Sequence, residues 1–174
     1  KKSKLKLINI GRLTDQKNQI LILKAINFLK KNLNLQLLIL GKGKNYNKLK
    51  DYIHENKLNN FVNLLGYKKN PYSYMVKASA LILSSLWEEV GFVIVESALS
   101  NLLVFSSNCP NGPKEFLDNG NAGYLFNTNE KNALKNIIVK INSENYKKRL
   151  LAKKNTLKYT KFRHFRIFSN ILSI

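Results

Sequence analysis

The sequence predicts a doubly wound α/β fold, in which helices cover both faces of a parallel sheet. Apolar runs of four to six residues alternate with segments of helical periodicity along most of the chain, and this alternation is typical of βαβ units. Three of the runs end at a glycine, namely Gly11, Gly41 and Gly66, as expected where a strand leads into a tight loop. With 174 residues and 44% hydrophobic content, the chain can bury a sizeable core as one domain, 1–174.

The expected elements follow one another along the chain. We predict strands at 5–10, 35–40, 61–65, 80–83, 102–106 and 124–126, and helices at 20–29, 49–53, 72–77 and 93–99, with further helices closing the chain. Thr14 or Asp15 is a candidate N-cap for the helix at 20–29. The segment 159–174 carries apolar side chains at helical spacing among basic residues, and we expect an amphipathic helix that packs on protein in preference to lipid.

Charge and composition limit the classes of function. The formal net charge is +20, which fits an anionic membrane or a polyanion as partner, although lysines scattered over a solvated surface would give the same balance. A single cysteine, Cys109, excludes an internal disulfide, and the two histidines are too far apart in sequence to indicate a metal site. No apolar run reaches the roughly 18 residues of a membrane span, so we expect a cytoplasmic protein.

Three of the ten acidic residues lie within nine positions. Glu88 and Glu89 precede an apolar helix, and Glu96 lies among its apolar residues, so Glu96 should be partly buried and in need of a polar partner. Helical side chains lean toward the N-terminus, which directs Glu96 to the first turn near Gly91, where free amides favour phosphates. Glu96 then suits ribose hydroxyls and Glu88 a sugar ring. Alternatively, Glu88 and Glu89 only complement the helix dipole, and a neighbouring Lys or Arg pairs with Glu96.

Two cations flank the loop after the first strand. Arg12 and Lys17 can both reach the carboxyl edge of the sheet, where ligands of open α/β sheets bind. Together they could hold a diphosphate and stabilise the charge of a departing nucleoside diphosphate without a metal ion. The sequence contains no Asp-x-Asp, so magnesium is not expected. The run at 41–44, Gly-Lys-Gly-Lys, matches neither a P-loop nor a full dinucleotide fingerprint and is expected to form a tight turn.

Together these stretches resemble glycosyltransferase family 4 of the GT-B superfamily, from about residue 7 to 141. Glu88 and Glu96, with seven residues between them, match the Glu-x7-Glu motif of that family. The other similar segments are the phosphate loop at 9–18, the strand and turn at 38–43, the short helix at 70–75 and the loop at 106–115. The family usually has Gly where this chain has Glu89, and a small-residue turn where it has Asn101.

The resemblance implies a Rossmann-like doubly wound sheet that forms the C-terminal half of a GT-B fold. It implies retaining, metal-independent transfer of a sugar from a UDP- or GDP-linked donor, with no cofactor, to a glycan or lipid-linked acceptor in surface polysaccharide or glycolipid synthesis. Arg12 and Lys17 would hold the diphosphate, Glu96 the ribose and Glu88 the donor sugar. The remaining donor-binding positions are Gly11, the amides of Gly91, Phe92 and Val93 near the sugar and phosphates, and base contacts at 41–44 and 66–68, which include Gly41 and Tyr67.

The chain lacks the N-terminal acceptor domain of that superfamily and begins at the foot of its first strand, so we expect missing upstream sequence and little transfer by this half alone. The acceptor would be presented at the inner membrane face, where an anionic membrane surface suits the basic charge.

Other interpretations remain open. A different class of function is a basic domain that binds nucleic acid or an anionic membrane; nucleic acid is the weaker expectation, because few aromatic residues alternate with basic ones. A sugar phosphorylase or sugar-nucleotide hydrolase would need catalytic residues that we do not find.

Overall fold

The structure is a computed structural model, and it describes residues 4–89, 91–130, 132–139 and 146–160. Its strands are β1 (Leu5–Ile10), β2 (Leu35–Leu40), β3 (Val62–Gly66), β4 (Ala80–Leu83), β5 (Leu103–Ser107) and β6 (Tyr124–Phe126). Its α-helices are α1 (Gln19–Leu29), α2 (Tyr46–Glu55), α3 (Tyr72–Met75), α4 (Phe92–Leu99), α5 (Pro113–Phe116), α6 (Ala133–Ile138) and α7 (Tyr146–Asn155). Short 3-10 helices are η1 (Asp15–Lys17), η2 (Asp118–Gly120) and η4 (Thr156–Tyr159).

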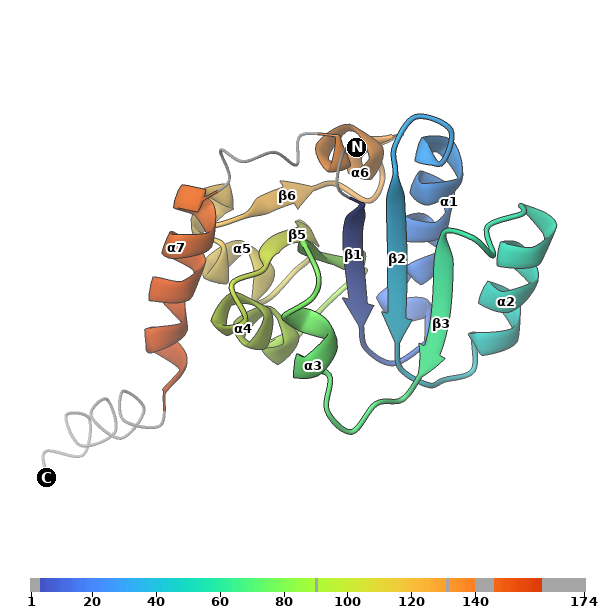
Figure 1. The fold of residues 1–174 in the computed structure, drawn as a ribbon. Helices are drawn as coiled ribbons and strands as arrows, with labels where there is room; N and C mark the ends of the chain where they lie inside the picture. The colour runs from blue at the N-terminus through green and yellow to red at the C-terminus, as the bar shows by residue number, and fades with distance from the viewer. Residues whose placement is uncertain (1–3, 90, 131, 140–145, 161–174) are drawn as a thin grey trace, which may run out of the picture.

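The strands form one parallel sheet in the order β3-β2-β1-β4-β5-β6. β1 pairs with β2 along its whole length, from Leu5 opposite Leu35 to Ile10 opposite Leu40, and pairs with β4 on its other side. The chain therefore winds outward from β1 twice, first through β2 and β3 and then through β4, β5 and β6 (Figure 1). This is the doubly wound Rossmann order, and it confirms the predicted fold class.

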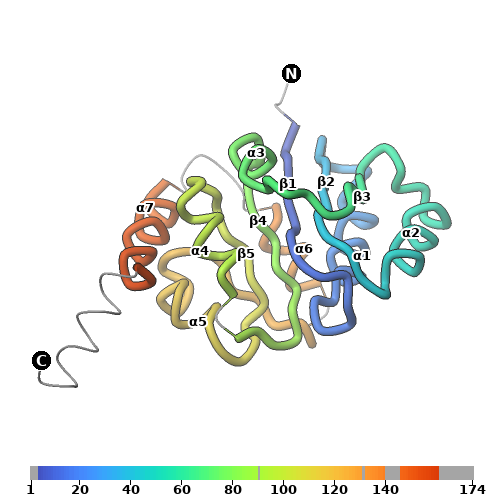
Figure 2. Tube along the Cα trace, turned by 90° about the horizontal axis from the view of Figure 1, so that it is seen from below, coloured from blue at the N-terminus to red at the C-terminus, as the bar shows by residue number. Residues whose placement is uncertain are grey.

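Two apolar layers hold the helices on opposite faces of the sheet, because successive side chains of a strand point to opposite sides. Leu7 of β1 belongs to the layer under α1, α2 and α6, whereas the next residue, Ile8, belongs to the layer under α3, α4, α5 and α7. α2 and α7 lie at opposite ends of the molecule in two perpendicular views (Figures 1 and 2). No helix in the described ranges is both long and apolar enough to cross a bilayer.

The predicted element bounds hold for most strands and shift at several helices. α1 begins at Gln19 after Asn18, which adopts a left-handed φ of 47°, so the expectation of Thr14 or Asp15 as its N-cap was wrong. Thr14 instead precedes η1. Asn tolerates the left-handed conformation, which lets the chain turn from η1 into α1. The amphipathic helix expected at 159–174 lies outside the described residues except for its first two positions.

The loops after β1 and β2 touch backbone to backbone. Gly41 has a φ of 148°, and a Cβ built on it would lie 1.8 Å from the carbonyl oxygen of Gly11. Two backbone hydrogen bonds also link the loops: the Gly11 amide donates to the Leu40 carbonyl at 3.0 Å, and the Leu13 amide donates to the Lys42 carbonyl at 3.0 Å. The glycine predicted to make a tight turn therefore also allows two neighbouring loops to meet.

Gly41→Ala should lower the free energy of unfolding by about 3 kcal/mol, because the new methyl group overlaps a backbone atom that cannot move aside. Urea denaturation followed by circular dichroism measures this loss. Gly66→Ala is the matched control, since Gly66 also has a positive φ, 69°, but no atom lies within 4 Å of its built Cβ. It should cost only about 1 kcal/mol of backbone strain, and equal losses in the two variants would contradict the proposed overlap.

Candidate functional site

Loops at the carboxyl ends of β1 and β4 enclose a hollow of about 480 Å³ beside the start of α4. We call it the first hollow. It is lined by Ile10, Gly11, Arg12, Gln16, Lys17, Trp87, Glu88, Glu89, Gly91, Phe92, Val93 and Glu96. Most of the residues singled out in the sequence therefore meet at one place, although the two clusters are about 70 positions apart in the chain.

Lys17 and Glu88 form a close ion pair in the first hollow. The Lys17 Nζ lies 2.6 Å from both carboxylate oxygens of Glu88, and only 4% of Glu88 is exposed. The Ser85 hydroxyl donates to Glu88 Oε1 at 2.5 Å, and the Ser107 hydroxyl donates to the Ser85 carbonyl at 2.6 Å. The carboxylate expected to meet a sugar is thus held in a network of donors, and the cation expected to meet a diphosphate is its partner.

Further contacts fix the two loops that carry this pair. The Ser84 hydroxyl donates to the carbonyls of Lys17 and Asn18, each at 2.9 Å. The Leu86 amide donates to Gln16 O at 2.8 Å, and the Gln16 side chain donates to the Trp87 carbonyl at 3.0 Å. These hydrogen bonds join residues 16–18 to the loop after β4. The two loops are therefore bonded to each other, which fixes the positions of Lys17 and Glu88.

Glu96 differs from Glu88 because its carboxylate has no hydrogen-bond or ion-pair partner among the described residues. It is partly buried on α4 and lines the first hollow, and burial raises its pKa above the ordinary value. The alternative in which a Lys or Arg pairs with Glu96 is not found; Lys17 pairs with Glu88 instead. Glu96 is thus an acceptor that a ligand with hydroxyl donors could satisfy.

The N-terminus of α4 faces the same space. Gly91 precedes the helix with a left-handed φ of 63°, and Phe92 and Val93 form its first turn, whose amides have no partner within the helix. Arg12 is exposed, and no described side chain or carbonyl pairs with its guanidinium. Its own carbonyl accepts from Gln19 Nε2 at 2.9 Å, which anchors the loop. A free cation and a helix N-terminus in one hollow favour an anionic ligand.

A second hollow of about 380 Å³ adjoins the first. It shares Ile10, Gly11 and Arg12 with the first hollow, and its other lining residues are Leu40, Gly41, Lys42, Tyr67, Lys68, Lys69 and Pro71. Tyr67 is 69% exposed, and the Lys42 Nζ lies 5.8 Å from the centre of its ring. This hollow combines apolar walls with donors and contains no acidic side chain, so it could receive a flat polar ring.

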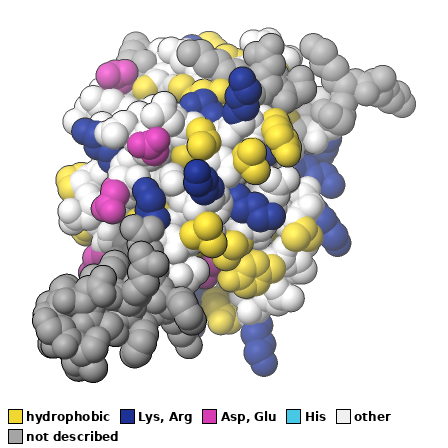
Figure 3. Space-filling model, turned by 90° about the vertical axis from the view of Figure 1, so that its left-hand side faces the viewer, with side chains coloured by type: hydrophobic (Ala, Val, Ile, Leu, Met, Phe, Trp, Pro, Cys, Tyr) yellow, Lys and Arg dark blue, Asp and Glu magenta, His cyan; other side chains and the backbone are white. Residues whose placement is uncertain are grey.

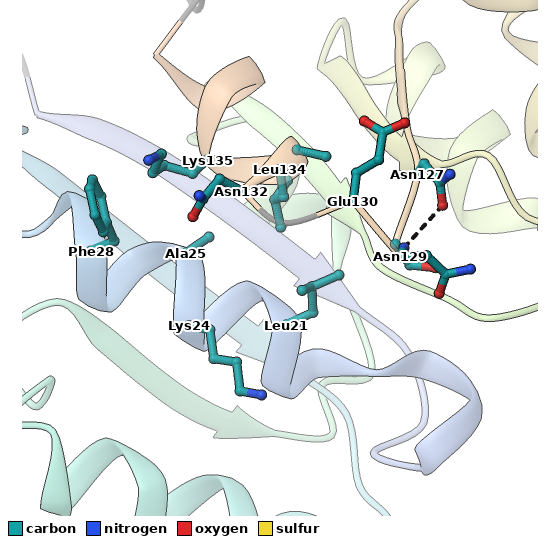
Figure 4. A pocket seen from close by; sticks show the side chains of 12 residues that line it. Leu21, Lys24, Ala25, Phe28, Asn127, Asn129, Glu130, Asn132, Leu134 and Lys135 are labelled. Atoms are coloured by element: carbon teal, nitrogen blue, oxygen red, sulfur yellow. Dashed lines mark hydrogen bonds between the residues drawn. The ribbon is translucent and has the colours of Figure 1, made fainter.

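A third hollow, of about 300 Å³, lies between α1 and α6 and lacks such a convergence of functional groups (Figure 4). Its Lys135 Nζ lies 3.8 Å from the ring centre of Phe28, and its Asn127 side chain accepts from the Asn129 amide at 3.0 Å. These groups satisfy one another locally. Among the residues the structure places, no three His, Cys, Asp or Glu side chains lie close enough to hold a metal ion.

Sequence reasoning assigned no role to five residues of the first hollow and its network, namely Gln16, Ser84, Ser85, Trp87 and Ser107. Ser85 precedes Glu88 by three positions, the Ser-x-x-Glu spacing of a capping box, and this spacing could have indicated a contact. Gln16 and Trp87 carry no such signal. The two departures from the family pattern also have a place in the structure, because Glu89 is exposed in the first hollow and Asn101 adopts a left-handed φ of 59°.

Removal of Lys17 should destabilise the fold even without ligand, because it leaves the buried carboxylate of Glu88 unpaired. We expect Lys17→Met to lower the free energy of unfolding by about 3 kcal/mol. The double variant Lys17→Met/Glu88→Met should lose less than the sum of the two single variants. Chemical denaturation of all four proteins measures the coupling, and additive losses would show that the pair contributes nothing as a pair.

Glu96→Gln should stabilise the unliganded protein at neutral pH. Burial raises the pKa of Glu96 in the folded state, so ionisation becomes unfavourable to the fold as pH rises from the unfolded to the folded pKa. The gain in melting temperature should therefore disappear below the ordinary glutamate pKa of about 4.3. Glu89→Gln, an exposed change in the same hollow, is the control and should show no such pH dependence. A pH-independent effect of Glu96→Gln would contradict the assignment.

Comparison with known proteins identifies the family and the fold. The profile of the family described as "Glycosyl transferases group 1" matches residues 1–159. An uncharacterised glycosyltransferase of Methanocaldococcus jannaschii is 40% identical over 63% of this chain and 27% of its own length. A Campylobacter jejuni enzyme, N-acetylgalactosamine-N,N'-diacetylbacillosaminyl-diphospho-undecaprenol 4-alpha-N-acetylgalactosaminyltransferase, is 31% identical over 74% of this chain and 34% of its own.

Solved structures share the fold at lower identity. A mutant of Staphylococcus aureus TarM, in complex with fondaparinux, alpha-GlcNAc-glycerol and UDP, superposes with a TM-score of 0.87 at 21% identity, over 98% of this chain and 36% of that one. Anabaena HepE in complex with UDP gives 0.82 at 21%, over 98% and 49%. The chain thus spans less than half the length of these relatives. By its profile match and its sheet, the chain belongs to the glycosyl transferase group 1 family and has the Rossmann-like α/β architecture of GT-B enzymes.

Proposed function

We propose that this chain is the donor-binding half of a retaining, metal-independent glycosyltransferase that uses a UDP- or GDP-linked sugar. The observation that carries the proposal is the adjacency of the two hollows, which share Ile10, Gly11 and Arg12. One hollow offers a flat aromatic wall with donors, and the other offers a free carboxylate, a free guanidinium and a helix N-terminus. A nucleoside diphosphate sugar presents complementary groups in the same linear order.

The base would occupy the second hollow. Tyr67 is exposed there beside Pro71 and Leu40, and aromatic or apolar walls suit the faces of a nucleobase. Lys42 and Lys68 line the same space and can donate to ring carbonyl oxygens, which both uracil and guanine carry. The base therefore need not be read by an acidic side chain.

The ribose and diphosphate would follow across the shared wall into the first hollow. Vicinal ribose hydroxyls provide two donors for the unpaired carboxylate of Glu96, which would also offset the desolvation that raises its pKa. The diphosphate would lie between Arg12 and the first amides of α4. Arg offers a planar fork for phosphate oxygens, and the helix dipole favours their charge.

Lys17 and Glu88 would exchange partners when the donor binds. In the unliganded chain the two charges neutralise each other at 2.6 Å. A diphosphate near Lys17 competes for its ammonium group, which frees acceptor positions on Glu88 for hydroxyls of the donor sugar. Ser85 would keep the carboxylate in place during this exchange, because its hydrogen bond to Oε1 comes from the loop itself.

The transfer would require no enzymic nucleophile. The bond between the anomeric carbon and the phosphate oxygen breaks as the acceptor oxygen bonds to the same face of that carbon, and the acceptor proton passes to the departing phosphate. Arg12, Lys17 and the α4 amides would stabilise the negative charge that develops on the nucleoside diphosphate. The acceptor would be a glycan or a lipid-linked sugar presented at the inner membrane face, with contacts from a further N-terminal domain.

Ligand binding can be followed through Trp87, the single tryptophan of the chain, which lines the first hollow and is 51% exposed. We expect UDP or GDP to change its fluorescence and to raise the melting temperature in the presence of EDTA. Arg12→Gln should weaken this binding by about ten- to a hundredfold, the effect of one charge-assisted hydrogen bond. Glu96→Gln should weaken binding of nucleotides that carry both ribose hydroxyls more than that of the 2′-deoxy analogue.

Lys44→Gln is the matched control for charge, because Lys44 lies in the neighbouring loop, pairs with Asp15 at 2.5 Å and lines neither hollow. It should leave nucleotide affinity unchanged within about twofold. If no nucleotide altered fluorescence or melting, while DNA or RNA bound tightly in low salt and Glu96→Gln made no difference, the donor-site proposal would fail. That result would support the basic binding domain as the function of this fold.

A further inference from the structure

The helix α7 has two unlike faces, and its inner face fastens it to the domain. Ala152 and Thr156 are buried, and the Tyr159 ring of η4 packs at 5.4 Å from that of Phe116. The Lys148 ammonium donates to the Gly120 carbonyl, and burial lowers its pKa. α7 also contacts α4 and β5. The orientation of this helix relative to the sheet is therefore fixed.

The outer face of α7 and η4 carries leucine and lysine side chains. Leu150, Leu151 and Leu157 are 55%, 42% and 62% exposed. Lys147, Lys154 and Lys158 are exposed beside them. These six residues, the α7 face, lie at positions i, i+3, i+4, i+7, i+10 and i+11, which share one side of a helix.

This face differs from an ordinary solvated helix surface. Residues 146–160 contain no Asp or Glu, so no lysine of the α7 face can form an i,i+4 ion pair within its own segment. Figure 3 views the molecule from the side on which α7 lies; apolar and basic side chains lie next to each other over part of that surface, and acidic side chains lie toward its left. A solvated surface needs no cluster of leucines there, and a purely electrostatic partner would not use them.

We propose that the α7 face is a docking surface for an anionic lipid bilayer. Exposed leucines can enter the boundary between headgroups and acyl chains, while the lysines around them contact lipid phosphates, as in amphipathic helices that lie in a membrane interface. Charge complementarity selects this partner, because residues 146–160 contain six Lys or Arg and no Asp or Glu. Nucleic acid fits less well, since the face offers aliphatic side chains where single-stranded binding uses aromatic ones.

Docking through the α7 face goes beyond the sugar transfer proposed above, and its test needs no nucleotide. Cosedimentation of the full chain with vesicles of phosphatidylglycerol and phosphatidylcholine in equal parts should show binding that weakens as salt rises. Vesicles of phosphatidylcholine alone should bind far less. The variant Lys147→Gln/Lys154→Gln/Lys158→Gln should reduce binding to the anionic vesicles on the order of a hundredfold. Leu150→Ser/Leu151→Ser/Leu157→Ser should reduce it by about tenfold or more.

The matched control removes three exposed lysines outside α7, Lys48 and Lys50 of α2 and Lys31 after α1, as Lys31→Gln/Lys48→Gln/Lys50→Gln. It carries the same change in net charge and should keep most of the binding. Equal losses in the control and in the lysine variant would overturn the proposal, because binding would then follow net charge alone. Tight binding to duplex DNA would also overturn the proposal if the α7 lysine variant weakened that binding and the control and leucine variants did not.

The stability of the leucine variant shows whether another part of the same protein covers these leucines. Leucines that face solvent or lipid should cost little when replaced, so its melting temperature should stay near that of the unmodified chain. A large fall in melting temperature, as for a core substitution, would show that another part of the protein covers these leucines and would overturn the proposal. In that case the lysine variant and the unmodified chain should bind anionic vesicles equally tightly.

Discussion

The parallel pairing of β1 with both β2 and β4 is the constraint on which the rest of this structure depends. Because β1 is central and its neighbours are reached by crossovers in opposite directions, the loops that leave β1 and β4 diverge at the carboxyl edge. The divergence leaves room for the first hollow, and the second hollow lies beside it among the loops after β1, β2 and β3. The backbone contact between Gly11 and Gly41 then fixes the wall that the hollows share, so the site depends on glycine as much as on its charged residues.

The positions of a few charged residues matter more for the site than the net charge of the chain. Most lysines are solvated, yet Lys17 is partly buried against Glu88, and Arg12 has no partner among the described residues at the shared wall. The few carboxylates are used differently. Glu88 is fully engaged by donors, whereas Glu96 is partly desolvated and free. An anion that entered the first hollow would disturb one ion pair and satisfy one cation, which is a modest reorganisation for a binding site.

The two surfaces of interest lie on different parts of the fold. The hollows open at the carboxyl edge of the sheet, while α7 covers the flank of the layer that also contains α4 (Figure 1). A contact between α4 and α7 connects them. If both proposals hold, a membrane would bind the flank and leave the donor hollows open to the acceptor and to the other half of the enzyme.

Periodicity in the sequence was sufficient for the sheet, because buried parallel strands require apolar runs and their loops require glycine or polar residues. It also located Glu96 correctly, since the lean of helical side chains is a local property. Bounds were less certain where polar residues extend a helix, as at Tyr46–Glu55, in which Leu49 and Ile53 are the buried residues. Residue type and position suggested roles for Arg12, Lys17 and Glu88, and the resemblance to a family implied the same roles, but neither predicted that Lys17 and Glu88 contact each other.

Only the tertiary structure decided which charges meet. Lys17 and Glu88 are 71 positions apart, and no local pattern tells whether each will meet a ligand or the other. The same holds for Leu150 of α7 and Leu157 of η4, whose exposure follows from which side of these two helices packs on the domain. Local spacing therefore determined the elements and the direction of single side chains, whereas pairing and exposure depend on segments that only folding brings together.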